Sequence, residues 1–263
     1  MEPEWEYRAV LAVDIERSAG RGNTALGRIR EALGTALRES VERSGIDWRA
    51  CLIDDLGDGL RLVAPAGVRK TALVHPLLHE LAVRLRAHNR MAGPTTRIRV
   101  RGALHAGEVR LDRAGGATGR PLEVLARMLD AAPVRTALER APEPVCVAVL
   151  LSQHFHDETV GHDYPGIDPE AFRRVTFTTK EHTADAWLHL PGAPLDPPEP
   201  APGAPAPSGA ASGTAPDAAG EAVAPPPAGH SAMYNQAWGN GTVNALRSGT
   251  QNIHLTRPED RAR

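Results

Sequence analysis

Runs of apolar residues and their spacing predict a series of strands and helices in the first two thirds of the chain. Residues 9–13 are all apolar and predict a buried strand that ends at Asp14. From Thr24 to Arg43, apolar residues recur at steps of three and four, which predicts an amphipathic helix packed on that strand. The apolar runs 51–53 and 60–63 flank a turn rich in Asp and Gly, so they predict a β-hairpin.

The pattern continues to about residue 190. Leucines at steps of four over 73–85 predict a second helix, and alternating arginine and apolar residues over 97–104 predict a half-buried strand. The remaining expected elements are a short strand at 107–109, a helix over 119–141, and strands over 145–151, 172–178 and 184–190. This order resembles the split β-α-β, ferredoxin-like plan, so we expect an α+β domain with an antiparallel sheet covered by helices on one face.

The composition changes sharply after residue 192. Residues 193–230 are dominated by Pro, Ala and Gly, with too little apolar surface to fold, so we expect a disordered linker behind a domain spanning 7–192. Within 231–263, the stretch 233–255 is rich in Asn, Gln and Gly and resembles the short amyloid-type signalling motifs of bacterial conflict systems. The alternative is a disordered tail or a small helix that docks on a signalling partner.

The charge, hydropathy and cysteine content of the chain bear on its binding partners and its cellular location. The formal net charge is -2, so no global field favours nucleic acid or an anionic membrane, and we expect neither as a partner. No apolar run is long enough to span a bilayer, and the acidic start does not resemble a signal peptide. The two cysteines lie in apolar runs, where reduced thiols are expected. These features predict a cytoplasmic protein.

Two carboxylates stand where they can meet. Asp14 ends the first strand and Asp58 lies in the hairpin turn, and the two become neighbours if those strands pair in the sheet. Paired carboxylates suit Mg²⁺ or Mn²⁺, whose coordination is completed by water and substrate phosphates. The alternative is that Asp14 caps the following turn and Asp58 only shapes the hairpin.

Several motifs together resemble the class III adenylate/guanylate cyclase domain over roughly residues 7–192, in a form similar to an actinobacterial subfamily. The segments that carry the resemblance are Val13-Asp14-Ile15, Leu56-Gly57-Asp58-Gly59, Arg99 to Val109, Gly119-x-x-Leu122-Glu123-x-x-x-Arg127, and Phe172 through Lys180 to Gly192. Each motif is weak alone and the set is specific.

The resemblance implies roles for particular residues. Asp14 and Asp58 would bind two metal ions, with the backbone carbonyl of Ile15 as a further ligand. Arg127 corresponds to the arginine that stabilises the transferring phosphoryl group, and Lys180 to a triphosphate-binding lysine. Class III sites form between two domains, so a homodimer that binds a nucleoside triphosphate is implied.

Three substrate-binding positions depart from the pattern of an active cyclase. Asp54 and Gly116 stand at the two base-contacting positions, and Glu123 replaces the helix asparagine that orients the ribose. Asp54 can accept hydrogen bonds from guanine, which favours guanine over adenine. The sequence thus leaves two functions open: a divergent nucleotide-binding cyclase homologue in intracellular signalling, and a catalytically inactive scaffold that signals through its C-terminal motif.

Overall fold

A mixed β-sheet lies at the centre of the computed structural model, which describes residues 4–112, 115–179 and 182–193. The strands are β1 (Glu4–Ile15), β2 (Leu52–Asp55), β3 (Gly59–Val63), β4 (Val100–Leu111), β5 (Ala117–Thr118), β6 (Val147–Ser152), β7 (Phe172–Thr179) and β8 (His182–His189). They are ordered β2-β3-β1-β4-β6-β8-β7, and β5 pairs with β4. The β4–β6 pair is parallel and the other pairs are antiparallel.

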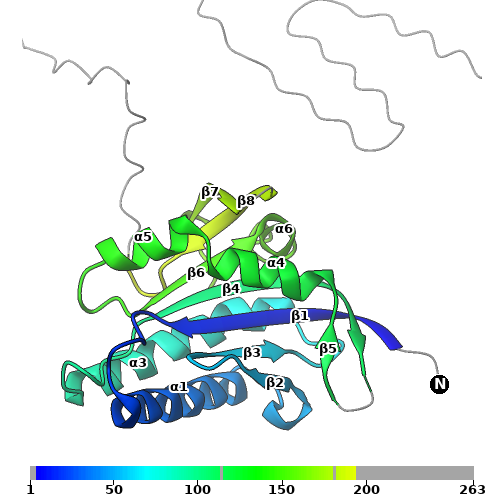
Figure 1. Cartoon of the computed structure of the whole chain (residues 1–263). Coiled ribbons are helices and arrows are strands. Elements are labelled where there is room, and N and C mark those ends of the chain that lie inside the picture. The colour runs from blue at the N-terminus through cyan, green and yellow to red at the C-terminus, as the bar shows by residue number, and fades with distance from the viewer. Residues whose placement is uncertain (1–3, 113–114, 180–181, 194–263) are drawn as a thin grey trace, which may run out of the picture. The chain divides into compact units, whose positions relative to one another are not determined.

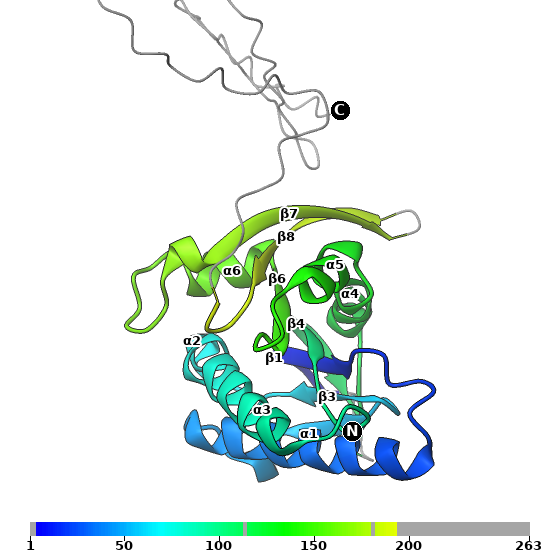
Figure 2. The ribbon, with the colours of Figure 1, turned by 90° about the vertical axis from the view of Figure 1, so that its left-hand side faces the viewer.

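Helices cover both faces of this sheet (Figures 1 and 2). They are α1 (Asn23–Arg43), η1 (Trp48–Ala50), α2 (Lys70–Ala72), η2 (Leu73–Leu78), α3 (His79–Met91), α4 (Arg120–Leu129), α5 (Ala132–Arg140), α6 (Gln153–Thr159) and η3 (Pro169–Ala171). The predicted α+β class with an antiparallel-rich sheet is confirmed. The expectation that helices cover only one face was wrong.

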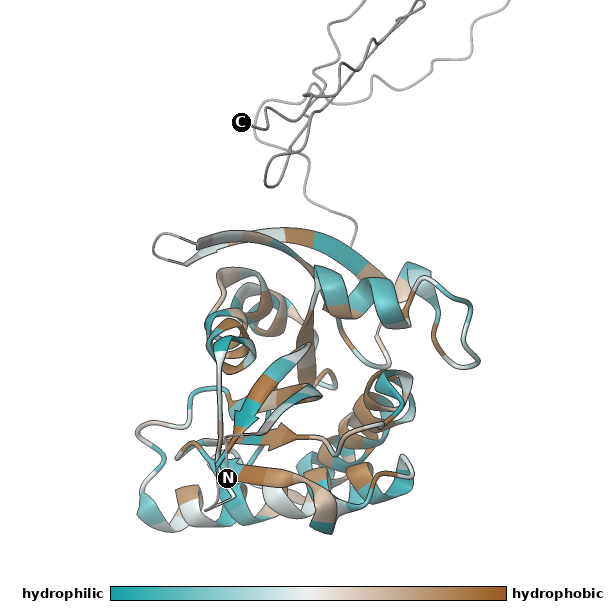
Figure 3. Ribbon diagram, turned by 90° about the vertical axis from the view of Figure 1, so that its right-hand side faces the viewer, coloured by the Kyte–Doolittle hydropathy of each residue, from teal (hydrophilic) through white to brown (hydrophobic). Residues whose placement is uncertain are grey.

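The composition of β1 explains why both faces are covered. Side chains alternate across a strand, and residues 9–13 are apolar on both sides. Leu11 and Val13 pack into a core with α1 and α3, whereas Val10 and Ala12 pack into a second core with α4 and α5. Figure 3 shows the apolar positions in brown along the strands and on the helices that pack on them. Burying each valine or leucine side chain of this set stabilises the fold by roughly 1.5–3 kcal/mol.

Some element boundaries differ from the predicted ones. The single helix expected over 119–141 is two helices, because Pro133 has no N–H to donate and its ring would clash with the preceding turn. The two strands expected over 97–109 are one long strand, β4, in which Gly107 continues the ladder opposite Arg8. A Cβ at Gly107 would lie 2.7 Å from Pro121 Cγ, so this glycine lets α4 approach the strand.

One further segment departs from expectation. The helix expected over 73–85 is interrupted at His75, whose extended backbone is the conformation favoured before a proline. After β6 the chain forms the short helix α6, capped by Ser152 Oγ, which accepts from Phe155 N at 3.2 Å. Within it, His156 is buried and stacks on Trp187 at 3.7 Å between ring centroids.

Several predictions fall on residues that the structure does not describe. The linker at 193–230, apart from Ala193, and the motif at 231–263 lie outside the described residues, as does Lys180. Cys51 and Cys146 are both free and buried. In the part of the chain that is described, no helix combines the length and apolar character that a membrane crossing requires.

Candidate functional site

Asp14 and Asp58 meet at one end of β1. Antiparallel pairing of β1 with β3 sets Asp14 opposite Gly59, and Asp58 precedes that glycine in the hairpin turn. The backbone N–H of Ile15 donates to the Asp58 carbonyl oxygen at 3.0 Å, which fixes the turn against the strand. The pairing therefore brings together the two carboxylates that the sequence singles out.

Gly59 permits this close approach. A Cβ at this position would lie 2.2 Å from the Val13 carbonyl oxygen and 3.0 Å from Asp14 Cα. Both are backbone atoms of β1, so neither can move aside as a flexible side chain would. The glycine after Asp58 is thus required by the packing of the hairpin on β1.

The two carboxyl groups differ in their acidity. Burial raises the pKa of Asp14 to about 6, against the attraction of Arg101 and together with a hydrogen bond to Asp58. For Asp58, burial acts in the same direction, but hydrogen bonds from Ser18 Oγ, at 2.6 Å, and from Asp14 outweigh it and lower its pKa. Asp14 therefore takes up a proton as the pH falls toward 6, whereas Asp58 stays ionised.

A guanidinium already lies on Asp14. Arg101 projects from β4 directly opposite Asp14 and donates from Nη2 to the carboxylate, and both side chains are mostly buried. Its Nε is buried and has no hydrogen-bond partner among the described residues. In the sequence, Arg101 is one of the arginines that alternate with apolar residues in a predicted strand, and this pattern does not predict its partner. The pairing with Asp14 follows from the register of β1 on β4.

The donor chemistry fits a hard divalent cation. Asp14 and Asp58 offer carboxylate oxygens, the ligands that Mg²⁺ and Mn²⁺ prefer. Among the described residues, no cluster of three or more His, Cys, Asp or Glu side chains suits a metal ion, so an ion held by this pair would keep positions for water and substrate oxygens. That is the usual arrangement for Mg²⁺ bound together with phosphates rather than in an all-protein cage.

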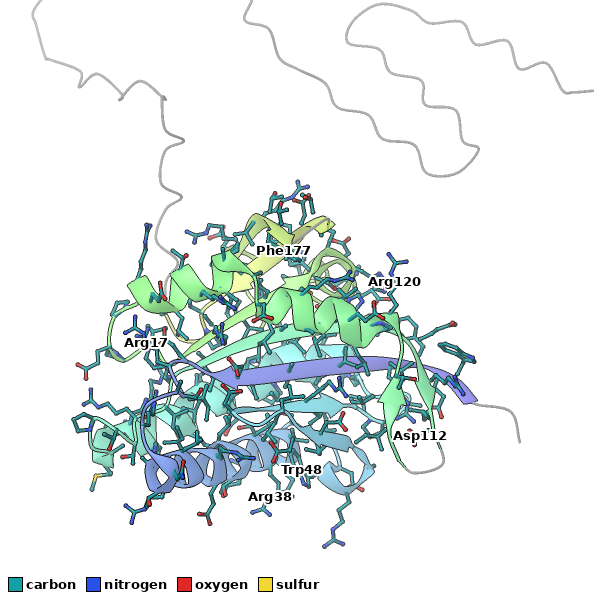
Figure 4. All side chains as sticks on the ribbon, in the orientation of Figure 1. Arg17, Arg38, Trp48, Asp112, Arg120 and Phe177 are labelled. Atoms are coloured by element: carbon teal, nitrogen blue, oxygen red, sulfur yellow. The ribbon has the colours of Figure 1, made fainter. Side chains whose placement is uncertain are left out.

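The loop between β1 and α1, in which Arg17 lies (Figure 4), is held in place by Arg21. The Arg21 guanidinium donates to the carbonyl oxygens of Arg17 and Glu16, each at 2.7 Å, and to that of Arg97. These contacts tie the loop after Asp14 to the turn before β4. Sequence patterns do not identify Arg21 as an anchor, because its acceptors are backbone carbonyl oxygens.

A small cavity opens beside Asp58. It has a volume of about 280 Å³ and lies between α1 and the β2–β3 hairpin, where Arg30, Asp55 and Gly59 are among its lining residues. Arg30 Nη2 donates to Asp55 Oδ2 at 2.6 Å across it. This volume lies just below the range of roughly 300–1,000 Å³ typical of ligand pockets, so one chain offers only a shallow site for a nucleotide.

The other predicted site residues lie apart from the carboxylate pair. Glu123 and Arg127 are exposed on α4, one turn apart, and form an ion pair with 3.8 Å between Oε2 and Nη2. No hydrogen bond or ion pair joins either of them to Asp14 or Asp58 within the described chain. In a single chain, α4 therefore does not complete the site.

The two predicted base-contacting positions have local partners. Asp54 Oδ2 accepts from Arg61 across the β2–β3 hairpin, at 2.9 Å from Nε and 2.8 Å from Nη2. Gly116 lies in the turn before β5, where its N–H donates to Asp112 Oδ1 at 2.7 Å. A Cβ at Gly116 would lie 2.5 Å from Asp112 Oδ2, so a larger residue here would displace the Asp112 carboxylate.

His105, on the α4 face of β4, gives the domain a pH-dependent stability. Its Nδ1 bonds Ser152 Oγ at 2.8 Å, and burial, followed by the charges of His154 and Arg120, lowers its pKa from 6.5 to about 4. Between these values the unfolded chain binds more protons than the folded one, so stability is lost as pH falls. From pH 8 to pH 5 we expect a loss on the order of 1–2 kcal/mol from this group.

Urea unfolding of wild type and His105→Gln at both pH values measures this contribution. Glutamine keeps a hydrogen-bonding group but does not titrate, so the free energy of unfolding of the variant should fall less on acidification. Parallel losses in the two proteins would show that His105 is not responsible.

No protein-family model matches the chain, and a search of curated proteins gives no match. Solved structures do match. The adenylate/guanylate cyclase/hydrolase from Silicibacter pomeroyi is 17% identical with a TM-score of 0.51, over 72% of this chain and 99% of that one. The adenylyl cyclase CyaB from P. aeruginosa is 12% identical with a TM-score of 0.50, over 73% and 98%.

A third similar structure contains a nucleotide. It is the catalytic core of a rhodopsin-guanylyl cyclase with converted specificity in complex with ATPαS, 13% identical with a TM-score of 0.51, over 72% of this chain and 99% of that one. At such identities the likeness concerns the fold. The described domain has the fold of class III adenylate and guanylate cyclase catalytic domains.

Proposed function

We propose that this domain binds a nucleoside triphosphate together with Mg²⁺ or Mn²⁺ held by Asp14 and Asp58. The observation that carries the proposal is the convergence of the two carboxylates at the end of β1, where Gly59 allows the hairpin to close on the strand. One structure of the same fold is a complex with ATPαS, which supports a nucleotide as the ligand class. The proposed setting is intracellular signalling.

The resemblance to class III cyclases assigns two metal ions to the pair, with the Ile15 carbonyl as a further ligand. Ions bound there would neutralise the triphosphate and activate the ribose 3′-hydroxyl for formation of a 3′,5′-cyclic nucleotide. When Asp14 serves as a metal ligand, Arg101 loses its partner and its guanidinium donors become free for phosphate oxygens. Lys180 is proposed to bind the triphosphate as well.

A homodimer is part of the proposal. Arg127 is about half exposed on α4 and makes no contact with Asp14 or Asp58 of its own chain among the described residues. A second copy can present its α4 to the carboxylate pair, which is the arrangement that the resemblance implies. The pairing of Arg127 with Glu123 would have to open for its guanidinium to reach a phosphoryl group.

Asp54 and Gly116 stand at the positions that would contact the base of the bound nucleotide, so they affect whether guanine or adenine is preferred. Asp54 uses Oδ2 for both contacts with Arg61, which leaves Oδ1 to accept from the N1 and N2 groups of guanine. Arg61 also orients the carboxylate, because the pair spans the hairpin in register. Gly116 offers no side chain to a base. We therefore favour a guanine nucleotide over an adenine nucleotide.

Glu123 favours a second candidate function. It places a carboxylate on the α4 face where the family pattern has an uncharged asparagine, and a carboxylate near a triphosphate repels it. The second candidate is a catalytically silent scaffold with the cyclase fold. It would signal by self-assembly or partner recruitment through residues 231–263. Because such a scaffold binds no triphosphate, Glu123 would repel nothing in it.

Calorimetric titration of the full chain with non-hydrolysable GTP and ATP analogues, each with Mn²⁺, tests the proposal. We expect Mn²⁺-dependent binding, tighter for the GTP analogue, that weakens at least about 100-fold in Asp14→Asn/Asp58→Asn because the ion loses both carboxylate ligands. Equal binding in that variant would reject the proposed site. Binding without cyclic nucleotide formation in a turnover assay with GTP would exclude the cyclase reaction and leave nucleotide binding, whereas absence of binding would favour the scaffold.

A further inference from the structure

Arginines gather around a second, larger cavity at the end of the sheet where β4 and β6 begin. It has a volume of about 680 Å³ and lies between the end of α3, the start of β4 and the segment that joins α5 to β6. Its lining includes Arg86, Arg90, Arg97 and Arg99, against a single carboxylate, Glu143. Neither Asp14 nor Asp58 lines it, so it is separate from the carboxylate pair.

The positive charge of this cavity is only partly balanced. Arg97 pairs with Glu143, and Arg99 Nη1 lies 3.6 Å from Glu16 Oε2. Within the described ranges, Arg86 and Arg90 form no hydrogen bond or ion pair with other residues. Arg86 is half-buried and Arg90 is exposed, so both guanidinium groups are accessible to an anion that enters the cavity.

Arg99 is held at the wall of the cavity. Its Nη2 donates to the Leu138 carbonyl at the end of α5, and its side chain is only 25% exposed. A guanidinium held in this way loses little conformational entropy when an anion binds.

The frame around the arginines is well fixed. The Asn89 side chain bonds the backbone of Ile98 twice, with Nδ2 to the carbonyl and Oδ1 to the N–H, each at 2.7 Å. Arg21 donates to the backbone carbonyl of Arg97 from the other side. The backbone that carries Arg97 and Arg99 is therefore held before any ligand arrives, which lowers the entropic cost of binding.

We infer that this cavity is a binding site for a small anion bearing two or more phosphate groups. Each guanidinium group can donate two hydrogen bonds to phosphate oxygens, and several such groups line this one cavity. The cavity volume lies within the usual range for small-molecule sites. No aromatic side chain is among the described residues that line it, so stacking on a base does not contribute and the phosphates themselves are what is recognised.

The test uses the full chain in metal-free buffer, with inorganic pyrophosphate as the probe in calorimetry. Arg86→Gln/Arg90→Gln removes two cavity charges that have no internal partner. Arg38→Gln/Arg49→Gln removes the same charge from exposed positions elsewhere, and Arg38 points away from the sheet on α1 (Figure 4). Asp14→Asn/Asp58→Asn disables the proposed metal site, so the two proposals can fail separately.

We expect pyrophosphate to bind with equal affinity to wild type, the Arg38/Arg49 variant and the Asp14/Asp58 variant. Its affinity for Arg86→Gln/Arg90→Gln should be lower by roughly tenfold or more, because two charge-assisted contacts are lost. Thermal unfolding of each variant confirms that it is folded, and Arg90→Gln alone serves if the double variant is not. Absence of binding, equal weakening in both arginine variants, or citrate binding as tightly as pyrophosphate would each overturn the inference.

Discussion

Gly59→Ala is expected to lower the free energy of unfolding by about 3 kcal/mol, as forced overpacking against backbone does. The new methyl group would lie 2.2 Å from the Val13 carbonyl oxygen, so the hairpin must move away from β1. Gly59 has no positive φ, so the loss would come from this clash and not from backbone conformation. The same shift would separate Asp58 from Asp14 and weaken Mn²⁺-dependent nucleotide binding.

Gly27→Ala is the matched control. It makes the same chemical change at an exposed position of α1, where a Cβ would meet no atom within 4 Å. Alanine favours helix over glycine, so this variant should be more stable by about 0.5–1 kcal/mol. Urea unfolding followed by tryptophan fluorescence measures both. A loss below about 1 kcal/mol in Gly59→Ala would contradict the packing described for the hairpin.

Arg101→Leu is expected to cost about 2–4 kcal/mol of stability at pH 8 in metal-free buffer, because it leaves the Asp14 carboxylate buried without its guanidinium partner. The penalty should shrink toward pH 5. The pKa of Asp14 is already raised to about 6 with Arg101 present, and removing that attraction raises it further. The folded state then takes up a proton more readily than the unfolded chain, so acidification relieves the unpaired charge.

The double variant Arg101→Leu/Asp14→Asn completes the comparison. Replacing the carboxylate with an amide removes the charge that Arg101 balanced, so this protein should be more stable at pH 8 than Arg101→Leu alone. A penalty for Arg101→Leu that is the same at pH 5 and pH 8, or that persists in full in the double variant, would show that charge pairing with Asp14 is not its cause.

The order of elements could be predicted from the sequence because apolar spacing reports which side of each element is buried. Residues 9–13 also carried the signal for a sheet covered on both faces, since a strand that is apolar at every position has no solvent side. The break before α5 was signalled by Pro133. The length of β4 could not be predicted, because the sequence does not distinguish a glycine within a strand, such as Gly107, from a glycine in a turn.

The candidate site was only partly accessible to sequence reasoning. Asp14 and Asp58 could be identified because Asp14 ends a predicted strand, Asp58 lies in the turn of the predicted hairpin, and the pairing of those strands was expected. The ion pair of Arg101 with Asp14 joins residues 87 positions apart and depends on the register of two strands, which spacing does not reveal. In the proposed homodimer, the place of Arg127 relative to the carboxylates would depend on a second chain, which the sequence of one chain does not position.

The most direct test of the central claim is a titration of the full chain with Mn²⁺, followed by electron paramagnetic resonance of the free ion, at a fixed concentration of a non-hydrolysable GTP analogue. Asp14→Asn and Asp58→Asn are compared singly with wild type, and Glu108→Gln, which removes an exposed carboxylate elsewhere, on β4, is the control. If Asp14 and Asp58 form one metal site, each of their variants loses the protein-dependent bound Mn²⁺ and Glu108→Gln retains it. Undiminished Mn²⁺ binding in either Asp14→Asn or Asp58→Asn would contradict the claim.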